Sequence, residues 1–246
     1  MPQADPISPH VQDYAKAVYA LEARAGDAAV STNDLAERLG VTPGSVSAMV
    51  RKLAELGLVE HQPYRGVKLT RHGREVALEV LRHHRLLELF LAQELGMPWD
   101  RVHDEAEVLE HVISEELEQL IAARLGHPTL DPHGDPIPTH AFEIDERPTR
   151  SLDELSAGAA GRFVRVSDSD PEMLRYLDGE GIALGDRLEV TRRQPFGGPV
   201  FVRLGASSAE GERELALGGE LARAMRVELE EGSSPASRRG EESARA

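Results

Sequence analysis

Side chains with metal-binding chemistry recur along a predicted helix in the middle of the chain. The segment 99–125 has the pattern of a single helix, in which successive residues turn by about 100°. That rotation brings four potential ligands to one face: His103, Glu107, Glu110 and His111. A neighbouring apolar face consists of Ala106, Leu109, Ile113, Leu117 and Leu120. Acidic groups half-buried beside an apolar stripe repel one another, and a divalent cation would offset that cost.

The helix predicted before it, residues 71–94, carries His84 and Glu88 about one helical turn apart. The two helices are separated by the helix breakers Gly96 and Pro98. One His–Glu pair at this spacing is more often a solvated helix face than a ligand set. Two helices with such groups, joined by a short turn, favour a metal site.

The other histidines are not expected to be metal ligands. Five of them show no such grouping and are predicted to lie on the surface or in a hairpin: His10, His61, His72, His83 and His127. His133 and His140 lie in the stretch 126–150, whose prolines exclude a helix, and are expected to have a structural role.

Composition limits the class of protein. The 246 residues include no cysteine, which excludes disulfides and thiolate metal sites. No apolar run approaches the roughly 18 residues of a membrane span. The N-terminus lacks the basic and apolar regions of a signal peptide. We therefore expect a cytoplasmic protein with no membrane partner.

The net charge of −15 is unevenly distributed along the chain. Residues 42–74 carry a net charge of +4, whereas residues 76–140 carry −9. The basic block suits an anionic partner such as DNA, because Lys and Arg contacts with phosphates supply much of the affinity for a duplex. The acidic, histidine-bearing block suits a cation.

The basic block belongs to a predicted winged helix-turn-helix. Residues 8–25 form an amphipathic helix. Ser31 and Gly40 are the predicted cap and end of a second helix, and Thr42 is the cap of a third. Two short β runs follow, on either side of the turn Pro63–Gly66, and would form the wing.

The third of these helices has the chemistry of a DNA reader. Its first turn offers backbone N–H groups, small hydroxyls and the positive end of the helix dipole to phosphates and base edges. The predicted DNA-binding residues are Thr42, Gly44, Ser45, Ser47, Arg51 and Lys52 of the helix and Arg65 and Lys68 of the wing. A structural or protein-binding domain is the alternative, and the basic block favours DNA.

Five segments are predicted, in a fold that is mainly α with a small β module. From about residue 151 short apolar runs alternate with glycine-containing turns, which indicates strands. The segments are a winged helix-turn-helix at 1–74, a helical metal-binding domain at 75–140, a linker at 141–150, the β module at 151–230 and a disordered tail at 231–246.

In this order the motifs resemble the diphtheria-toxin-repressor family of iron- and manganese-dependent regulators. The segments that carry the resemblance are RHHRLLELFL, RVHDEAEVLEHVISEELE and GHPTLDPHGDPIP, and the match extends from residue 8 to about residue 230. The resemblance implies a three-domain homodimer in which residues 75–140 form both the metal-binding and the dimerisation domain, and in which the β module is an SH3-like barrel. Such proteins bind palindromic operator DNA when loaded with metal and usually repress metal-uptake genes.

The resemblance also implies two metal sites. The first would consist of Asp13, Glu107, Glu110 and His111. The second would use His84, Glu88 and His103, completed from the stretch SDSDPEMLRYL. Ser169 and Glu172 occupy the family's Glu and Gln positions in that stretch, so Ser169 departs from the pattern. Asp168 or Asp170 would replace it after a shift of one residue.

The types of the ligands favour manganese over iron. Iron-type members carry Met at the position of Asp13 and Cys at that of Glu107, whereas manganese-type members carry carboxylates, as this chain does. Carboxylate and imidazole ligands suit Mn²⁺, with Fe²⁺ as the alternative. A cation that ties Asp13 to the later helix would couple metal binding to DNA binding, typically by ~1–3 kcal/mol.

Two alternatives come from other classes. His/Glu clusters also serve metal catalysis, as in dinuclear hydrolases, but the sequence offers no nucleophile motif or Gly-rich phosphate loop, and the winged helix would be unexplained. The second alternative is a winged-helix sensor of an organic ligand, which a metal titration followed by Trp99 fluorescence would distinguish. We predict a metal-dependent transcription regulator that is not an enzyme.

Overall fold

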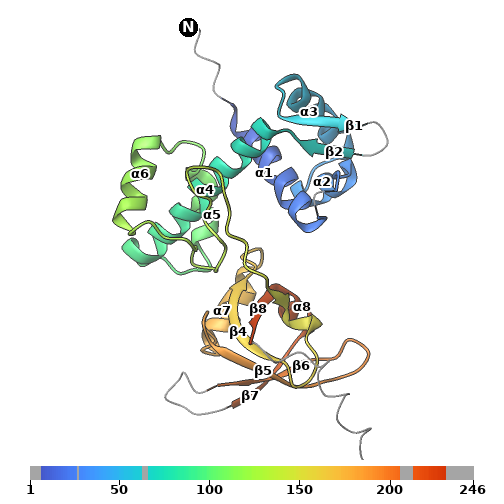
Figure 1. Cartoon of the computed structure of the whole chain (residues 1–246), viewed down its shortest axis with the longest axis vertical. Coiled ribbons are helices and arrows are strands. Elements are labelled where there is room, and N and C mark those ends of the chain that lie inside the picture. The colour runs from blue at the N-terminus through green and yellow to red at the C-terminus, as the bar shows by residue number, and fades with distance from the viewer. Residues whose placement is uncertain (1–6, 27, 63–65, 206–212, 231–246) are drawn as a thin grey trace, which may run out of the picture. The chain divides into compact units, whose positions relative to one another are not determined.

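Three helices and a hairpin form the N-terminal part of the computed structural model, which describes residues 7–26, 28–62, 66–205 and 213–230 (Figure 1). The elements are α1 (Pro9–Arg24), α2 (Thr32–Leu39), α3 (Pro43–Glu55), β1 (Val59–Gln62) and β2 (Gly66–Leu69). Ser31 accepts the Asp34 N–H and Thr42 accepts the Ser45 N–H, so α2 and α3 begin at side-chain caps as predicted. The predicted disordered tail lies outside the described residues.

Helix α4 (Arg71–Leu95) runs through two hydrophobic cores. Near its start, Val76, Ala77 and Leu78 pack with α1–α3 and the hairpin. Farther along, Leu86 and Leu89 pack with the helices that follow. None of the described helices, this long one included, has the length and apolar character needed to cross a membrane.

The segment 99–125 is not one helix, so that prediction is wrong. It forms α5 (Val102–Leu109) and α6 (Glu115–Arg124), separated by a turn. The break is stabilised at Ser114, whose side chain accepts the Leu117 N–H and caps α6. After the break the helical face changes direction, and Leu117 and Leu120, predicted on the buried stripe, are 48% and 61% exposed.

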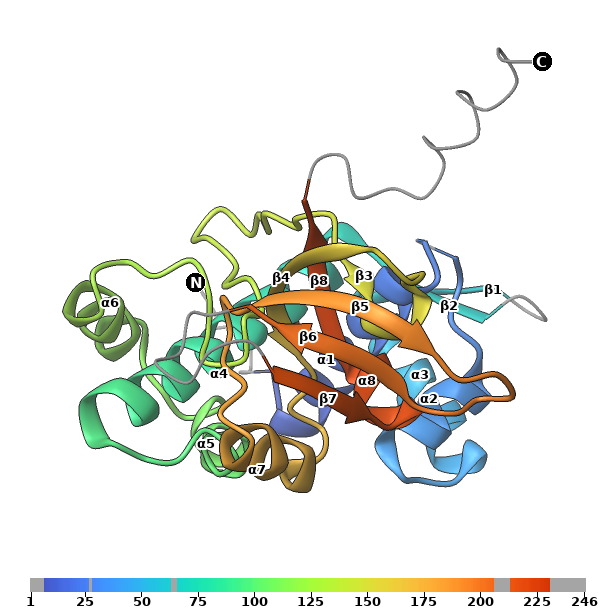
Figure 2. The same ribbon diagram turned by 90° about the horizontal axis from the view of Figure 1, so that it is seen from below.

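A six-stranded antiparallel sheet forms the predicted β module (Figure 2). The strand order is β3-β8-β4-β5-β6-β7, and bulges interrupt the β4–β8 and β5–β6 pairings. Its elements are β3 (Arg150–Ser151), β4 (Ala160–Val166), α7 (Pro171–Gly179), β5 (Arg187–Arg193), β6 (Val200–Leu204), β7 (Arg213–Leu217), α8 (Gly219–Ala224) and β8 (Met225–Leu229). Phe163, Val202 and Val227 are fully buried in its core.

The chain divides into two compact units, each described here by itself. The first consists of residues 1–91, 104–129 and 137–144, and holds the winged helix with most of the helical segment. The second consists of residues 92–103, 130–136 and 145–246, and holds the sheet. The first unit has no break at residue 74, because α4 continues through that position.

Candidate metal centre

The first unit brings Asp13 of α1 to the turn that follows α5. His111 Nε2 lies 2.9 Å from Asp13 Oδ1 and 3.4 Å from Glu110 Oε1. One ligand atom of each residue lies within 4.8 Å of the others. These three predicted ligands, which come from segments almost a hundred residues apart, therefore meet at one point.

The ring of His111 is oriented so that one nitrogen faces these carboxylates. Its Nδ1 lies 2.7 Å from Gln12 Oε1, which accepts the Nδ1–H. In the neutral ring Nε2 then carries a lone pair, directed at Asp13 and Glu110. Carboxylate oxygens and an imidazole lone pair converging on one point form the donor set of a divalent cation such as Mn²⁺. The residues present thus fit a metal ion.

Glu107, the fourth predicted ligand, pairs with Lys16, which is not among the predicted site residues. Lys16 Nζ lies 2.7 Å from Glu107 Oε1 and 2.6 Å from Glu110 Oε1. Burial lowers the pKa of Lys16, but the two carboxylates outweigh it and the net shift is upward. The sequence feature that could have placed Lys16 at the site is its spacing, because Lys16 follows Asp13 by three residues and lies on the same face of α1.

His84 lies closer to this centre than its predicted role in a separate second site implies. Its Nδ1 is 2.5 Å from Glu110 Oε2, and its Nε2 is 3.1 Å from Glu88 Oε1. Burial lowers the pKa of His84, yet the hydrogen bonds with Glu110 and Glu88 raise it to about 9. His84, Glu107 and Glu110 thus form a second ligand cluster that shares Glu110 with the first.

The second unit pairs His103 with an aspartate from the stretch SDSDPEMLRYL. His103 Nδ1 lies 3.0 Å from Asp168 Oδ2. Asp170 instead caps α7, where its side chain accepts the Glu172 N–H at 2.9 Å. Glu172 is exposed in the first turn of that helix. Of the three acids considered there, the structure brings Asp168 to His103.

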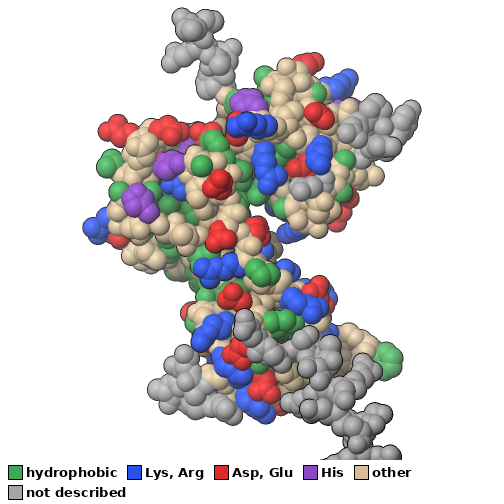
Figure 3. Space-filling view, viewed as in Figure 1, with side chains coloured by type: hydrophobic (Ala, Val, Ile, Leu, Met, Phe, Trp, Pro, Cys, Tyr) green, Lys and Arg blue, Asp and Glu red, His purple; other side chains and the backbone are tan. Residues whose placement is uncertain are grey.

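The predicted DNA-binding residues of α3 lie on one open surface. Thr42, Gly44, Ser45, Ser47, Arg51 and Lys52 are all exposed. Lys68 is half-buried on β2, and Arg65 lies outside the described residues. Figure 3 shows several Lys and Arg side chains on the visible face of this part, while histidines and acids gather over α4–α6.

Large apolar side chains are exposed along α5, the turn after it and α6. We call them the α5–α6 patch: Val108, Val112, Leu117 and Leu120, with exposed fractions of 69%, 76%, 48% and 61%. Single exposed apolar residues are common on protein surfaces, whereas a group of them on adjoining elements is typical of a protein interface.

Two histidines predicted as non-ligands are buried. His133 is fully buried, stacks on Trp99 and contacts the Trp99 carbonyl oxygen through Nε2, which agrees with a structural role. His83 was predicted on the surface or in the hairpin, and this is wrong, because only 7% of it is exposed. Its Nδ1 lies 3.1 Å from the backbone carbonyl oxygen of Glu110, just after α5, and its Nε2 lies 3.9 Å from Glu118 Oε2 of α6.

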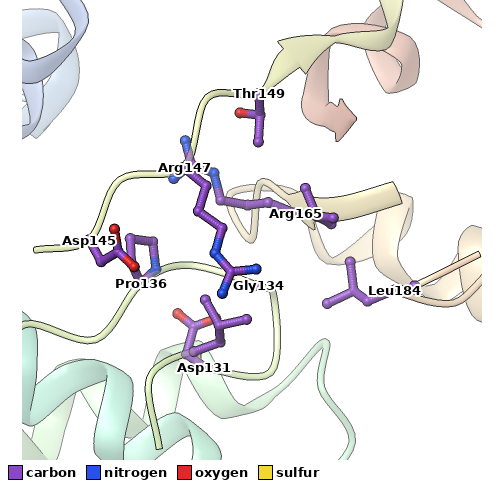
Figure 4. Close-up of a pocket in the computed structure, with 11 residues that line it drawn as sticks. Asp131, Gly134, Pro136, Asp145, Arg147, Thr149, Arg165 and Leu184 are labelled. Carbon is purple, nitrogen blue, oxygen red and sulfur yellow. The ribbon is translucent and has the colours of Figure 1, made fainter. Parts of the chain in front are cut away.

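The second unit also contains a cavity of about 290 Å³ beside β4 (Figure 4). Charged side chains of both signs surround it, among them Asp131, Asp145, Arg147 and Arg165. Asp131 accepts the backbone N–H groups of His133 and Asp135, and Arg165 lies 3.4 Å from Asp135. These contacts hold the proline-rich segment in shape, so we regard the cavity as structural.

Family models match nearly the whole chain. Residues 7–67 match the N-terminal DNA binding domain of the iron dependent repressor, and residues 70–139 match its metal binding and dimerisation domain. Residues 150–229 match the FeoA domain, which covers the sheet.

Relatives and solved structures agree with these matches. The chain is 32% identical over 207 residues to the iron-dependent repressor IdeR of Mycobacterium bovis, covering 79% of this chain and 86% of that protein. It is 33% identical over 209 residues to the diphtheria toxin repressor of Corynebacterium glutamicum, covering 80% and 87%. A manganese-dependent transcriptional repressor in complex with manganese superposes with a TM-score of 0.80 at 44% identity, covering 89% of this chain and 100% of that chain. The manganese regulator SloR gives 0.72 at 30%, covering 91% and 100%.

These findings confirm the predicted fold class, with a helix-turn-helix part, a helical metal-binding part and an SH3-like β part. They also exclude the hydrolase alternative and confirm that the chain is not an enzyme, because the matching domains and relatives are those of DNA-binding repressors. The chain belongs to the iron-dependent repressor family of metal-dependent transcriptional regulators.

Proposed function

We propose that the protein is a manganese-responsive repressor in which a metal ion held between α1 and α5 controls binding to an operator. The observation that carries the proposal is the meeting of Asp13 with His111 and Glu110, with 2.9 Å between Asp13 Oδ1 and His111 Nε2. Asp13 belongs to the first helix of the DNA-binding part, whereas the other two belong to the metal-binding part.

The first proposed site consists of Asp13, Glu107, Glu110 and His111. A bound Mn²⁺ would supply two positive charges at the point where these donor atoms converge. Asp13 then anchors α1 to the turn after α5. Helix α1 shares a core with α2 and α3, through Val18, Leu35 and Leu53. Anchoring α1 therefore also fixes the position of α3, the helix with the predicted DNA-binding residues. This links the metal and DNA sites through direct packing.

Operator binding is proposed to involve two copies of the chain. Joined through the α5–α6 patch, the copies would each present α3 to a major groove of a palindromic operator. The grooves would lie about one helical turn of DNA apart, or a multiple of it. We infer that the homodimer works in the cytoplasm, where it represses metal-uptake genes and maintains metal homeostasis.

Manganese is favoured as the effector because of the donor atoms. Carboxylates at Asp13 and Glu107 are hard oxygen ligands, which suit Mn²⁺ better than thioether or thiolate sulfur would. A similar solved structure is that of a manganese-dependent repressor with bound manganese, at 44% identity. The relatives from Mycobacterium and Corynebacterium include an iron-dependent repressor, so Fe²⁺ is the second candidate.

The first prediction concerns the response to metal. Glu110→Gln and His111→Ala remove central donors, so we expect both variants to bind operator DNA equally with Mn²⁺ and with chelator. The wild type should bind more tightly with Mn²⁺, by about 5- to 150-fold, as measured by gel shift. Glu105→Gln is the matched control, since Glu105 is exposed on α5. The proposal would be contradicted if the affinity of the wild type for operator DNA did not change on addition of Mn²⁺, Fe²⁺ or Zn²⁺.

The second prediction concerns Lys16. A metal ion must displace its ammonium group from Glu107 and Glu110, and hydrogen bonds to charged groups are each worth about 1.5–3 kcal/mol. Lys16→Met should therefore bind Mn²⁺ more tightly, by roughly tenfold or more, and should be less stable without metal. Calorimetric titration and thermal unfolding measure the two effects. Lys52→Met, on the exposed face of α3, should change neither, and an unchanged Kd in Lys16→Met would count against displacement.

The third prediction concerns the second site, whose ligand from the stretch SDSDPEMLRYL we propose to be Asp168, beside His103. The 3.0 Å distance between His103 Nδ1 and Asp168 Oδ2 supports this acid over Asp170 and Glu172. Asp168→Asn should weaken binding of the second ion by at least roughly tenfold, and Glu172→Gln should leave it unchanged. Equilibrium dialysis provides the measurement, and the reverse order of effects would show that the assignment is wrong.

The fourth prediction concerns the dimer. Val112→Asp places a charge in the α5–α6 patch and should raise the dimer dissociation constant by roughly thirtyfold or more, equivalent to about 2 kcal/mol. Phe196→Asp is the control, because Phe196 is fully exposed in the second unit, outside the patch. Sedimentation velocity over a range of concentrations distinguishes them. Equal association of the two variants would exclude the patch as the interface.

A further inference from the structure

We propose that the first unit contains an additional divalent-cation site, formed by Glu79 and His83 of α4 with Glu115 of α6. One ligand atom of each residue lies within 4.8 Å of the others. Glu79 and His83 are one turn apart on α4, and Glu115 is the first residue of α6. None of the three belongs to the sites proposed above.

The ring of His83 is held in the orientation that a metal ligand requires. Its Nδ1 lies 3.1 Å from the backbone carbonyl oxygen of Glu110, which can only accept, so Nδ1 carries the hydrogen. Nε2 therefore has the free lone pair, and it has no hydrogen-bond partner among the described residues although the side chain is more than nine-tenths buried. Metal-binding histidines are commonly fixed in this way, by a carbonyl on the opposite nitrogen.

The carboxylates near His83 Nε2 also favour the binding of a cation. Glu118 Oε2 lies 3.9 Å from His83 Nε2, but Arg82 already neutralises that carboxylate through a 2.7 Å contact from Nε to Glu118 Oε1. In the described part of the chain, neither Glu79 nor Glu115 forms an ion pair with a Lys or Arg side chain. Glu79 is hydrogen-bonded to Glu115, and burial together with this bond raises the pKa of Glu79 to about 7. A divalent cation held between the two carboxylates would offset the repulsion of their charges.

The donor set defines the class of ion. One imidazole nitrogen and two carboxylate oxygens leave coordination positions open for water, and Glu115 is exposed, so an ion can enter from solvent. At such a nitrogen and oxygen site Zn²⁺ binds more tightly than Mn²⁺. The ring that would hold the ion through Nε2 also binds the backbone of Glu110 through Nδ1. The additional site is therefore in direct contact with the residue shared by both clusters of the metal centre.

The test is the number of Zn²⁺ ions that the full chain binds at saturation, measured by equilibrium dialysis with metal analysis. Glu115→Gln and His83→Gln should each bind one ion fewer than the wild type. Glu116→Gln is the matched control, because Glu116 is the exposed neighbour on α6, and it should bind as many ions as the wild type. His111→Ala should retain the ion at Glu79, His83 and Glu115, so this result is independent of the first metal site.

Anomalous scattering at the zinc edge from crystals of the wild type locates the ion directly. A peak bounded by Glu79, His83 and Glu115 is expected. Equal stoichiometry in wild type and Glu115→Gln, or the absence of that peak, would overturn the proposal. His83→Gln could lose an ion through misfolding, whereas Glu115 is exposed and its replacement leaves the core intact, so Glu115→Gln decides the outcome.

Discussion

The burial of one carboxylate, that of Glu110, is the constraint on which the centre of the first unit depends. Only 1% of this residue is exposed, and an isolated carboxylate in such a position would be strongly unfavourable. It is stabilised by Lys16 from α1 and by His84 from α4, while its backbone carbonyl binds His83. The buried negative charge of Glu110 thus has partners from two helices, α1 and α4, which meet at the turn after α5.

This arrangement gives the protein a built-in cation at the place where an external one is proposed to act. Lys16 neutralises Glu107 and Glu110 and lies on the same helix as Asp13. The carboxylates would therefore be neutralised in both states of the site, by the Lys16 ammonium group when no metal is bound and by the metal ion when it is. The affinity for metal would then depend on the difference in free energy between the state with Lys16 and the state with the ion.

Much of the fold could be predicted from local sequence, because helix caps act over three or four residues. Ser31 and Thr42 show this for α2 and α3. The prediction of a single helix over 99–125 was wrong because the apolar residues keep a helical spacing on both sides of the break. Only the cap at Ser114 marks the start of α6. The period of the apolar residues reports their spacing along the sequence, and it gives no information on a change in the direction of the helix.

The candidate site could be predicted where its residues share a local motif or the family pattern, as Asp13 and Glu110 do. His83 and Lys16 could not, because their partners are distant in the sequence: Glu115 lies 32 residues after His83, and Glu107 lies 91 residues after Lys16. The choice of Asp168 over its neighbours likewise depends on the start of α7, where Asp170 is already used as a cap.

Helix α4 has a consequence for how the first unit unfolds. It supplies apolar side chains to the core of the DNA-binding part and to the core around α5 and α6, and it contains no proline or internal glycine between them. Neither core can lose its packing without exposing part of the same helix, and a helix that has lost one side of its support is only marginally stable in water. We therefore expect the DNA-binding part and the part around α5 and α6 to unfold cooperatively, so that stabilising either part protects the other from local opening.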